Sequence, residues 1–205
     1  MRVGRGIGST ETQGAIELWQ QIKKRAAHAE CPPPVLSDGW GGHREALVQV
    51  YGQVPEYGGR GRPPTRKRPV PGWHYTQMVK QRDATGNLIG VDIRVIYGDE
   101  TTLTRTGTRT VYVERTNLTS RLMNGRLVRK TLGFSKALTM LEASCAWEDV
   151  VYNLTRSVKT LRVEVMPQTK CRWIHRSPAM AAGITDHIWS IRQVLMAVPV
   201  PTNSI

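Results

Sequence analysis

The segment between Gly52 and Gly72 places the strongest limit on how this chain folds. It contains the run Tyr57-Gly-Gly-Arg-Gly-Arg-Pro-Pro-Thr-Arg-Lys-Arg-Pro69, which has almost no apolar side chains and a dense positive charge. Such a segment buries too little apolar surface to offset the entropy that is lost on ordering it. We therefore expect a solvated basic arm, with the packed core built from the sequence on either side of it.

The charge of the whole chain indicates a polyanionic partner. The 205 residues include 29 Lys and Arg against 16 Asp and Glu, which gives a formal net charge of +13. An excess of this size is typical of proteins that bind nucleic acid. No apolar run reaches the ~18 residues of a transmembrane helix, and the N-terminal residues lack the apolar core of a signal peptide. The sequence predicts no membrane association.

The three cysteines give little sign of a structural cross-link. Cys31, Cys145 and Cys171 are far apart, odd in number and outside any Cys-x-x-Cys pair. This spacing argues against a disulfide framework or a structural zinc site and favours a reducing cytoplasm. His28 lies three residues before Cys31, but a lone pair of ligands is a weak metal signal, because zinc sites use three or four.

The sequence before the arm predicts an α/β unit. Thr10 and Gln13 have the spacing of a capping box at the start of a helix over about residues 11–29, which the prolines after Cys31 end. A short apolar strand follows at 35–36, with Asp38 at its carboxyl end, and residues 43–51 predict a second helix. Ligands and metals gather at such strand ends in α/β sheets.

The sequence after the arm predicts a β-hairpin and then helices. Apolar residues alternate on both sides of Thr85-Gly-Asn87, which is a turn signal, and residues 101–110 form a polar connector. A helix from Val111 onward carries Glu114 at its start, and its apolar face is predicted from helical spacing. That face comprises Leu118, Leu122, Leu127 and Val128. Further helices are expected at 137–152, after Pro178, and at 186–195 with Thr185 as the cap.

Both acids have a structural and a functional interpretation. Asp38 either caps the following loop as an Asx-turn or binds a ligand at the strand end. Glu114 is either a first-turn acid that the helix dipole favours or a carboxylate that holds a divalent metal against a phosphodiester.

Within the arm, Arg60-Gly61-Arg62-Pro63 has the residue order of an AT-hook. This extended motif resembles one that inserts two arginines into the narrow minor groove of A·T-rich DNA, where the negative potential is enhanced. Arg66, Lys67 and Arg68 extend the positive charge beyond it. The alternative is a generic basic linker that meets phosphates without sequence preference.

Several motifs together resemble a known family, the bacterial insertion-sequence transposases of the DDE type, and in particular the InsB-like group. The resemblance covers most of the chain from Asp38 onward, and its most specific part is the Glu-Arg-Thr-Asn-Leu-Thr string at 114–119. It is carried by Ser37-Asp-Gly-Trp-Gly-Gly42, Val113-Glu-Arg-Thr-Asn-Leu-Thr119, Arg129-Lys-Thr-Leu-Gly-Phe-Ser-Lys136, Tyr152-Asn153 and Ser177-Pro-Ala-Met-Ala-Ala-Gly-Ile-Thr-Asp186.

The resemblance implies an α/β fold with a ribonuclease-H-like core over residues 1–205, in which 52–110 is an inserted basic arm plus β-hairpin. In that family three carboxylates bind two Mg²⁺ (or Mn²⁺) ions for DNA strand cleavage and transfer. Asp38 matches the second acid and Glu114 the third. Arg115 and Asn117 would flank the site on DNA phosphates, with Arg121 on the same basic helix. The partners implied are insertion-sequence ends and target DNA in the bacterial nucleoid.

The chain departs from the family at its first acid. No aspartate precedes Asp38, although the family places one on an earlier strand. We therefore expect the C-terminal portion of such a transposase, incomplete at its N-terminus and inactive alone, which self-associates or pairs with a full-length transposase. The alternative is a non-catalytic DNA-binding protein or transposition inhibitor. RNA binding is a weaker reading, because the few aromatic residues are scattered.

Overall fold

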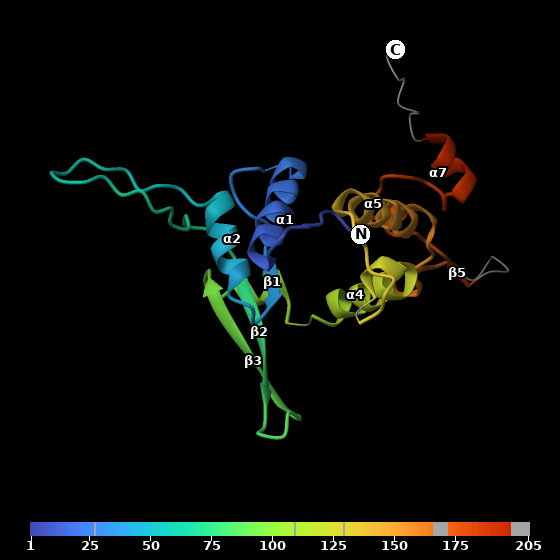
Figure 1. Cartoon of the computed structure of the whole chain (residues 1–205), viewed down its shortest axis with the longest axis horizontal. Helices are drawn as coiled ribbons and strands as arrows, with labels where there is room; N and C mark the ends of the chain where they lie inside the picture. The colour runs from blue at the N-terminus through green and yellow to red at the C-terminus, as the bar shows by residue number, and fades with distance from the viewer. Residues whose placement is uncertain (27, 109, 129, 166–171, 198–205) are drawn as a thin grey trace, which may run out of the picture. The chain divides into compact units, whose positions relative to one another are not determined.

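The computed structural model describes residues 1–26, 28–108, 110–128, 130–165 and 172–197 of a mixed α/β chain (Figure 1). Two compact units make up the chain, one from Val3–Thr116 and the other from Met1–Arg2 with Asn117–Ile205. The boundary falls inside helix α4 (Val111–Met123). The expectation of one domain over 1–205 stays a prediction, and the two units are described separately below.

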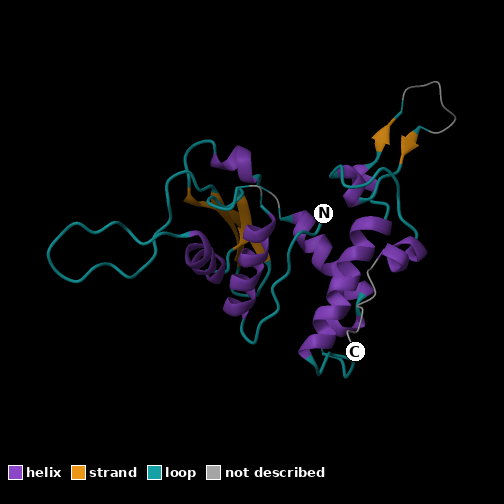
Figure 2. Ribbon diagram, turned by 90° about the horizontal axis from the view of Figure 1, so that it is seen from above, coloured by secondary structure: helices purple, strands orange, loops and turns teal. Residues whose placement is uncertain are grey.

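The first unit contains a three-stranded sheet in the order β1-β2-β3. Strand β1 (Val35–Asp38) pairs in parallel with β2 (Tyr75–Arg82), and β2 pairs antiparallel with β3 (Leu88–Tyr97). The connection from β1 to β2 runs through helix α2 (Gly42–Tyr51) and the basic arm, which Figure 2 draws as a long loop. The predicted strand, second helix and hairpin are thus confirmed in kind and nearly in extent.

The core of this unit lies where α1 (Glu11–Arg25) and α2 pack together on one face of the sheet. Leu47 is 1% exposed and Tyr75 is fully buried, and an edge-on contact joins Tyr51 and Trp73 with ring centroids 6.5 Å apart. Val35 is buried in the same cluster and is the direct partner of Tyr75 in the sheet. This pairing shows which side of β1 and β2 the two helices cover.

The capping prediction for α1 is confirmed at Thr10, whose side chain accepts a hydrogen bond from the Gln13 backbone N–H at 3.2 Å. The reciprocal contact differs, because the Gln13 side chain accepts from the backbone N–H of Ser9 instead. The helix ends at Arg25, earlier than residue 29, because Ala26 already has extended backbone angles. Cations in its last turn, Lys23 among them, suit the negative end of the helix dipole.

The polar connector at 101–110 contains a short helix that the sequence did not predict. Helix α3 (Thr102–Thr106) lies against the sheet, and Thr102 is fully buried. The Thr102 hydroxyl lies 3.0 Å from His74 Nδ1, and the Thr106 hydroxyl lies 3.0 Å from that of Thr76 on β2. These polar contacts hold the connector on the sheet face opposite α1 and α2.

The second unit is built around the long helix α5 (Leu138–Thr155), against which α6 (Pro178–Ala181) and α7 (Ile191–Ala197) pack. Arg2 belongs to this unit and forms an ion pair with Glu148, whose side chain is 6% exposed. The remaining elements are the 3-10 helices Gly125–Leu127 and Lys159–Leu161 and the strands β4 (Val163–Glu164) and β5 (Trp173–Ile174).

Two expectations for this part of the chain are wrong. The apolar face predicted from residue 118 to 128 is not buried, since Leu118 is 56% and Leu122 is 79% exposed. Helix α4 ends at Met123 and Asn124 begins a 3-10 turn, so that Leu127 and Val128 do not continue its face. The last helix begins at Ile191 and not at 186, because the Thr185 hydroxyl accepts from the Trp189 indole without capping a helix.

Among the described residues, no helix combines the length and apolar character that crossing a bilayer requires.

Candidate nucleic-acid interface

Asp38 forms a local turn at the carboxyl end of β1. One of its carboxylate oxygens accepts a hydrogen bond from the Trp40 backbone N–H at 3.3 Å, which is the Asx-turn that the sequence left open. The residue is nevertheless exposed to solvent. Burial lowers the pKa of nearby His43, while the negative charge of Asp38 opposes that shift.

Glu114 lies in the first turn of α4 and forms an ion pair with Lys80 of β2. The Thr110 hydroxyl also donates a hydrogen bond to it, at 3.5 Å from Oε1. The hydrogen bond from Lys80, and then the lysine's positive charge, hold the pKa of Glu114 below its ordinary value. The carboxylate is therefore ionised at neutral pH and is already neutralised by a cation of the same unit.

Both acids belong to the same face of the sheet. Directly paired residues share a face, and so do alternate residues along a strand. Asp38 is the direct partner of Met78, and Lys80 follows two residues later on β2. The Thr110 hydroxyl lies 3.3 Å from Met78 Sδ and also bonds Glu114, which brings the start of α4 onto this face. The fold thus places the two acids, 76 residues apart in sequence, on the side opposite α1 and α2.

The donor set falls short of the metal site that the resemblance implies. Within the described ranges, no three His, Cys, Asp or Glu side chains are grouped to hold a metal ion. The residues outside those ranges include no Asp or Glu. Two carboxylates, one of them paired with Lys80 and the other engaged in a turn, do not fit a two-metal centre.

Replacing Lys80 with methionine is expected to raise the pKa of Glu114 toward its ordinary value, because the variant loses both the hydrogen bond and the charge. Since the folded-state pKa is depressed, this contact stabilises the fold at neutral pH, and its contribution is lost as the pH falls through that pKa. Carboxyl-carbon NMR titration of Glu114 measures the change. Lys136→Met is the control, and an unchanged titration in Lys80→Met would refute the assignment.

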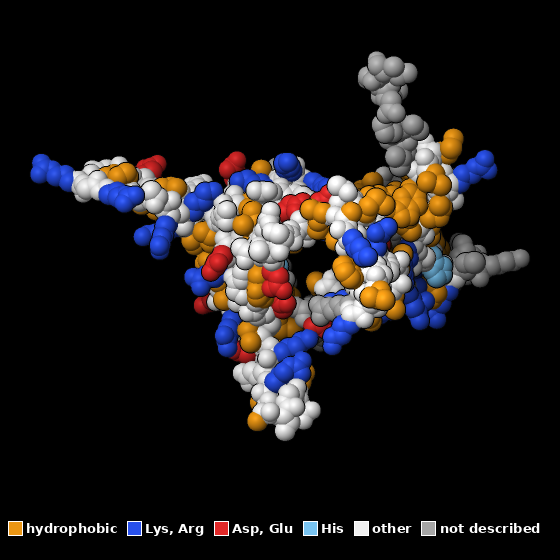
Figure 3. Space-filling model, viewed as in Figure 1, with side chains coloured by type: hydrophobic (Ala, Val, Ile, Leu, Met, Phe, Trp, Pro, Cys, Tyr) orange, Lys and Arg blue, Asp and Glu red, His pale blue; other side chains and the backbone are white. Residues whose placement is uncertain are grey.

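The basic arm presents its cations to solvent. Arg60, Arg62 and Arg66 are exposed, and their side chains have no hydrogen bond or ion pair among the described residues. Gly61 has φ +115°, a left-handed backbone that favours glycine. Pro63 is also exposed. Figure 3 shows lysine and arginine side chains along the whole projecting arm.

The arm is held at its root. Backbone hydrogen bonds join Gln53 and Arg68 in both directions, at 3.0 and 2.8 Å. The Lys67 ammonium donates to the Gln49 carbonyl at 2.7 Å. Of the predicted DNA-binding residues, Lys67 and Arg68 therefore also fix the returning end of the loop, Lys67 to the last turn of α2 and Arg68 to Gln53 just after that helix.

The second group of predicted DNA-binding residues lies on α4. Arg115, Asn117 and Arg121 are all exposed, and Asn117 and Arg121 are four residues apart, on one face of the helix. Arg115 directly follows Glu114 in the first unit, whereas Asn117 and Arg121 belong to the second.

Sequence reasoning missed Lys80 and Arg2. Lys80 lies 34 residues from Glu114, in a strand where an exposed lysine is ordinary, so that no local pattern pointed to the pair. Arg2 also lies with its guanidinium 4.1 Å from the centre of the Tyr152 ring, and its backbone carbonyl accepts from the Asn153 side chain at 2.8 Å. The Tyr152-Asn153 motif was the only signal that this part of α5 had a special contact.

Comparisons of the chain with models of protein families, with curated proteins and with solved structures found no match. The resemblance to insertion-sequence transposases rests on the motifs in the sequence.

Proposed function

We propose that this chain binds double-stranded DNA as a protein of the DDE transposase type, InsB-like, and that the 205-residue chain alone does not cut it. The observation that carries the proposal is the exposed basic arm, in which Arg60, Arg62 and Arg66 have no partner among the described residues. Cations that make no internal contact stay available for phosphates, and binding then gains from counterion release.

The arm also has a shape suited to a groove. It is an extended loop fixed at its root by the Gln53–Arg68 bridge, and the glycine of its Arg-Gly-Arg-Pro core has a backbone conformation that other residues rarely adopt. A narrow A·T-rich minor groove accepts such a backbone and attracts the two arginines. The exposed residues of α4, Arg115, Asn117 and Arg121, would add phosphate contacts.

A ribonuclease-H-like core is part of the proposal. A parallel β1–β2 pair with an intervening helix, and an acid at the end of β1, are compatible with such a core that carries the arm and hairpin as an insertion. The shared sheet face of Asp38 and Glu114 agrees with their assignment to the second and third acids of the family.

Metal-dependent strand cleavage does not follow for this chain alone. In the family, Mg²⁺ or Mn²⁺ would stabilise the charge that develops during phosphodiester exchange. Here the two acids would have to hold such ions without a third carboxylate, and the Lys80 ammonium already occupies Glu114. We accordingly assign DNA retention, and not cleavage, to this polypeptide.

A second candidate function is a DNA-binding protein in which the acids serve only the fold. Two contacts favour this second function, because in each of them an acid stabilises the fold: Asp38 closes a turn, and Glu114 pairs with Lys80. Such a protein could inhibit transposition by occupying DNA ends or by pairing with a full-length transposase.

Both candidate functions require that the chain binds DNA through phosphate contacts. Binding of a short A·T-rich duplex, followed by fluorescence anisotropy from about 50 to 200 mM salt, tests this requirement; a flat salt dependence would refute both candidates.

A further inference from the structure

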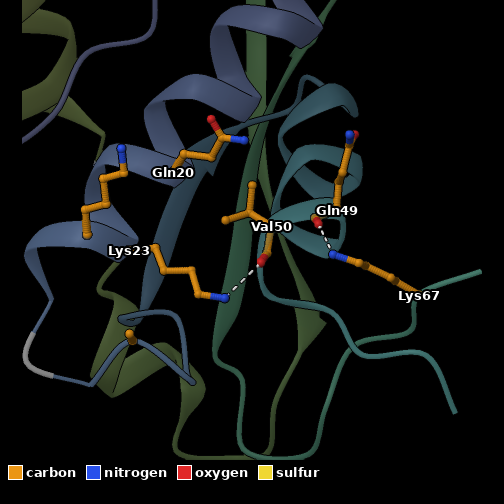
Figure 4. A pocket seen from close by; sticks show the side chains of 7 residues that line it. Gln20, Lys23, Gln49, Val50 and Lys67 are labelled. Atoms are coloured by element: carbon orange, nitrogen blue, oxygen red, sulfur yellow. Dashed lines mark hydrogen bonds between the residues drawn. The ribbon is translucent and has the colours of Figure 1, made fainter.

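A basic groove lies beside the root of the arm in the first unit. Its volume is about 840 Å³, and it is bounded by the carboxyl-terminal part of α1 with Ala29 after it, by the last turn of α2 and by the returning end of the arm. Three lysines line it, Lys23, Lys24 and Lys67, and no Asp or Glu does. Figure 4 shows the Lys23 and Lys67 side chains reaching the same end of α2 from two different elements.

The carboxyl end of α2 fixes two of these ammonium groups. Lys23 Nζ donates to the Val50 carbonyl at 3.1 Å, and Lys67 Nζ donates to the Gln49 carbonyl at 2.7 Å. An ammonium group has three protons, so that each lysine keeps two for an incoming acceptor. Because the helix carbonyls already hold them, a ligand would not have to order these two long side chains.

Lys24 adds a third positive charge to the groove. Its side chain is exposed and has no hydrogen bond or ion pair among the described residues. Gln20 and Gln49 also line the groove and bring neutral amide groups. Three cations and two amides around an open space match a polyanion with several oxygen acceptors.

We propose that this groove binds backbone phosphates of the DNA that the arm holds. The inference rests on the proposed function and adds a second, separate point of contact. Lys67 links the two, because it lines the groove and belongs to the arm between Arg66 and Arg68. DNA bound by the arm would thus also contact α1. No sequence motif had linked this helix to DNA binding.

The test compares the double variant Lys23→Gln/Lys24→Gln with the wild-type chain on one duplex over a salt series. The control variant Lys136→Gln removes one exposed charge from the other unit. We expect the double variant to bind roughly tenfold more weakly at low salt, with a log–log salt slope flatter by about 1 to 2, since each phosphate contact contributes about 0.9. Lys24→Gln alone breaks no internal contact and should give about half of the slope change.

The outcomes separate this inference from the proposed function. If the wild-type chain binds DNA and both groove variants match Lys136→Gln in affinity and slope, the groove is not a phosphate site while the proposed function stands. If the wild-type chain binds no DNA, both fail together. Thermal melting of each variant, followed by circular dichroism, checks that a flatter salt dependence of binding does not come from unfolding.

Discussion

Replacing Arg60, Arg62 and Arg66 together with alanine should weaken DNA binding by roughly a hundredfold near 0.1 M salt and flatten the log–log salt slope by about 2.7. All three side chains are exposed and have no partner among the described residues, so that each is free to release a counterion from a phosphate. Anisotropy titrations at several salt concentrations measure both quantities. None of the three arginines belongs to the core cluster, so the melting temperature should stay the same.

A charge-conserving variant separates the two readings of the arm. The double variant Arg60→Lys/Arg62→Lys keeps the two positive charges that attract phosphates. It replaces the planar guanidinium groups that would enter a narrow groove. If the arm acts as an AT-hook, this variant loses its preference for A·T-rich over G·C-rich duplex while its salt slope is kept. A generic basic linker shows no preference in either form. Alanine variants that bind like the wild type would contradict the role of the arm altogether.

Leu47→Ala is expected to lower the free energy of unfolding by about 2–5 kcal/mol, the usual loss for a large-to-small change in a packed core. Leu47 is 1% exposed and packs between α1, α2 and the sheet, in the cluster with Tyr75 and Trp73. Urea denaturation followed by tryptophan fluorescence measures the change, because Trp19 and Trp73 are buried in this cluster.

The control for this variant is Leu132→Ala. Leu132 is 95% exposed, and its truncation should change the free energy of unfolding by no more than about 0.5 kcal/mol. A loss at Leu47 as small as that at Leu132 would mean that α1 and α2 do not cover the sheet as described.

Local signals in the sequence predicted much of the first unit. Thr10 capped its helix, the strand before Asp38 formed, and the turn after Asp83 joined β2 and β3. Each of these depends on residues a few positions apart, and the Asp83 carboxylate, for example, accepts hydrogen bonds from the Thr85 and Asn87 backbone N–H groups. Such short-range contacts can be predicted from the sequence before the fold is known.

Tertiary contacts account for what the sequence did not show. Helical spacing predicted that Leu118 and Leu122 would be buried, but spacing states which side chains share a face and not whether another element covers it. Asp38 was predicted from its place at the end of a strand and Glu114 from its place at the start of a helix, whereas the cation that neutralises Glu114 comes from a distant strand. The basic groove likewise joins residues of α1, α2 and the arm. These residues are too far apart in the sequence for a local pattern to connect them.

The most direct test of the whole account follows supercoiled plasmid DNA with the full chain and increasing Mg²⁺ or Mn²⁺. Agarose electrophoresis reports nicking, and a mobility shift on the same samples reports binding. We expect a mobility shift that weakens steeply with salt and no metal-dependent nicking. Nicking by the wild type that both Asp38→Ala and Glu114→Ala abolish, with binding kept, would contradict it and show that the two acids work as a metal site.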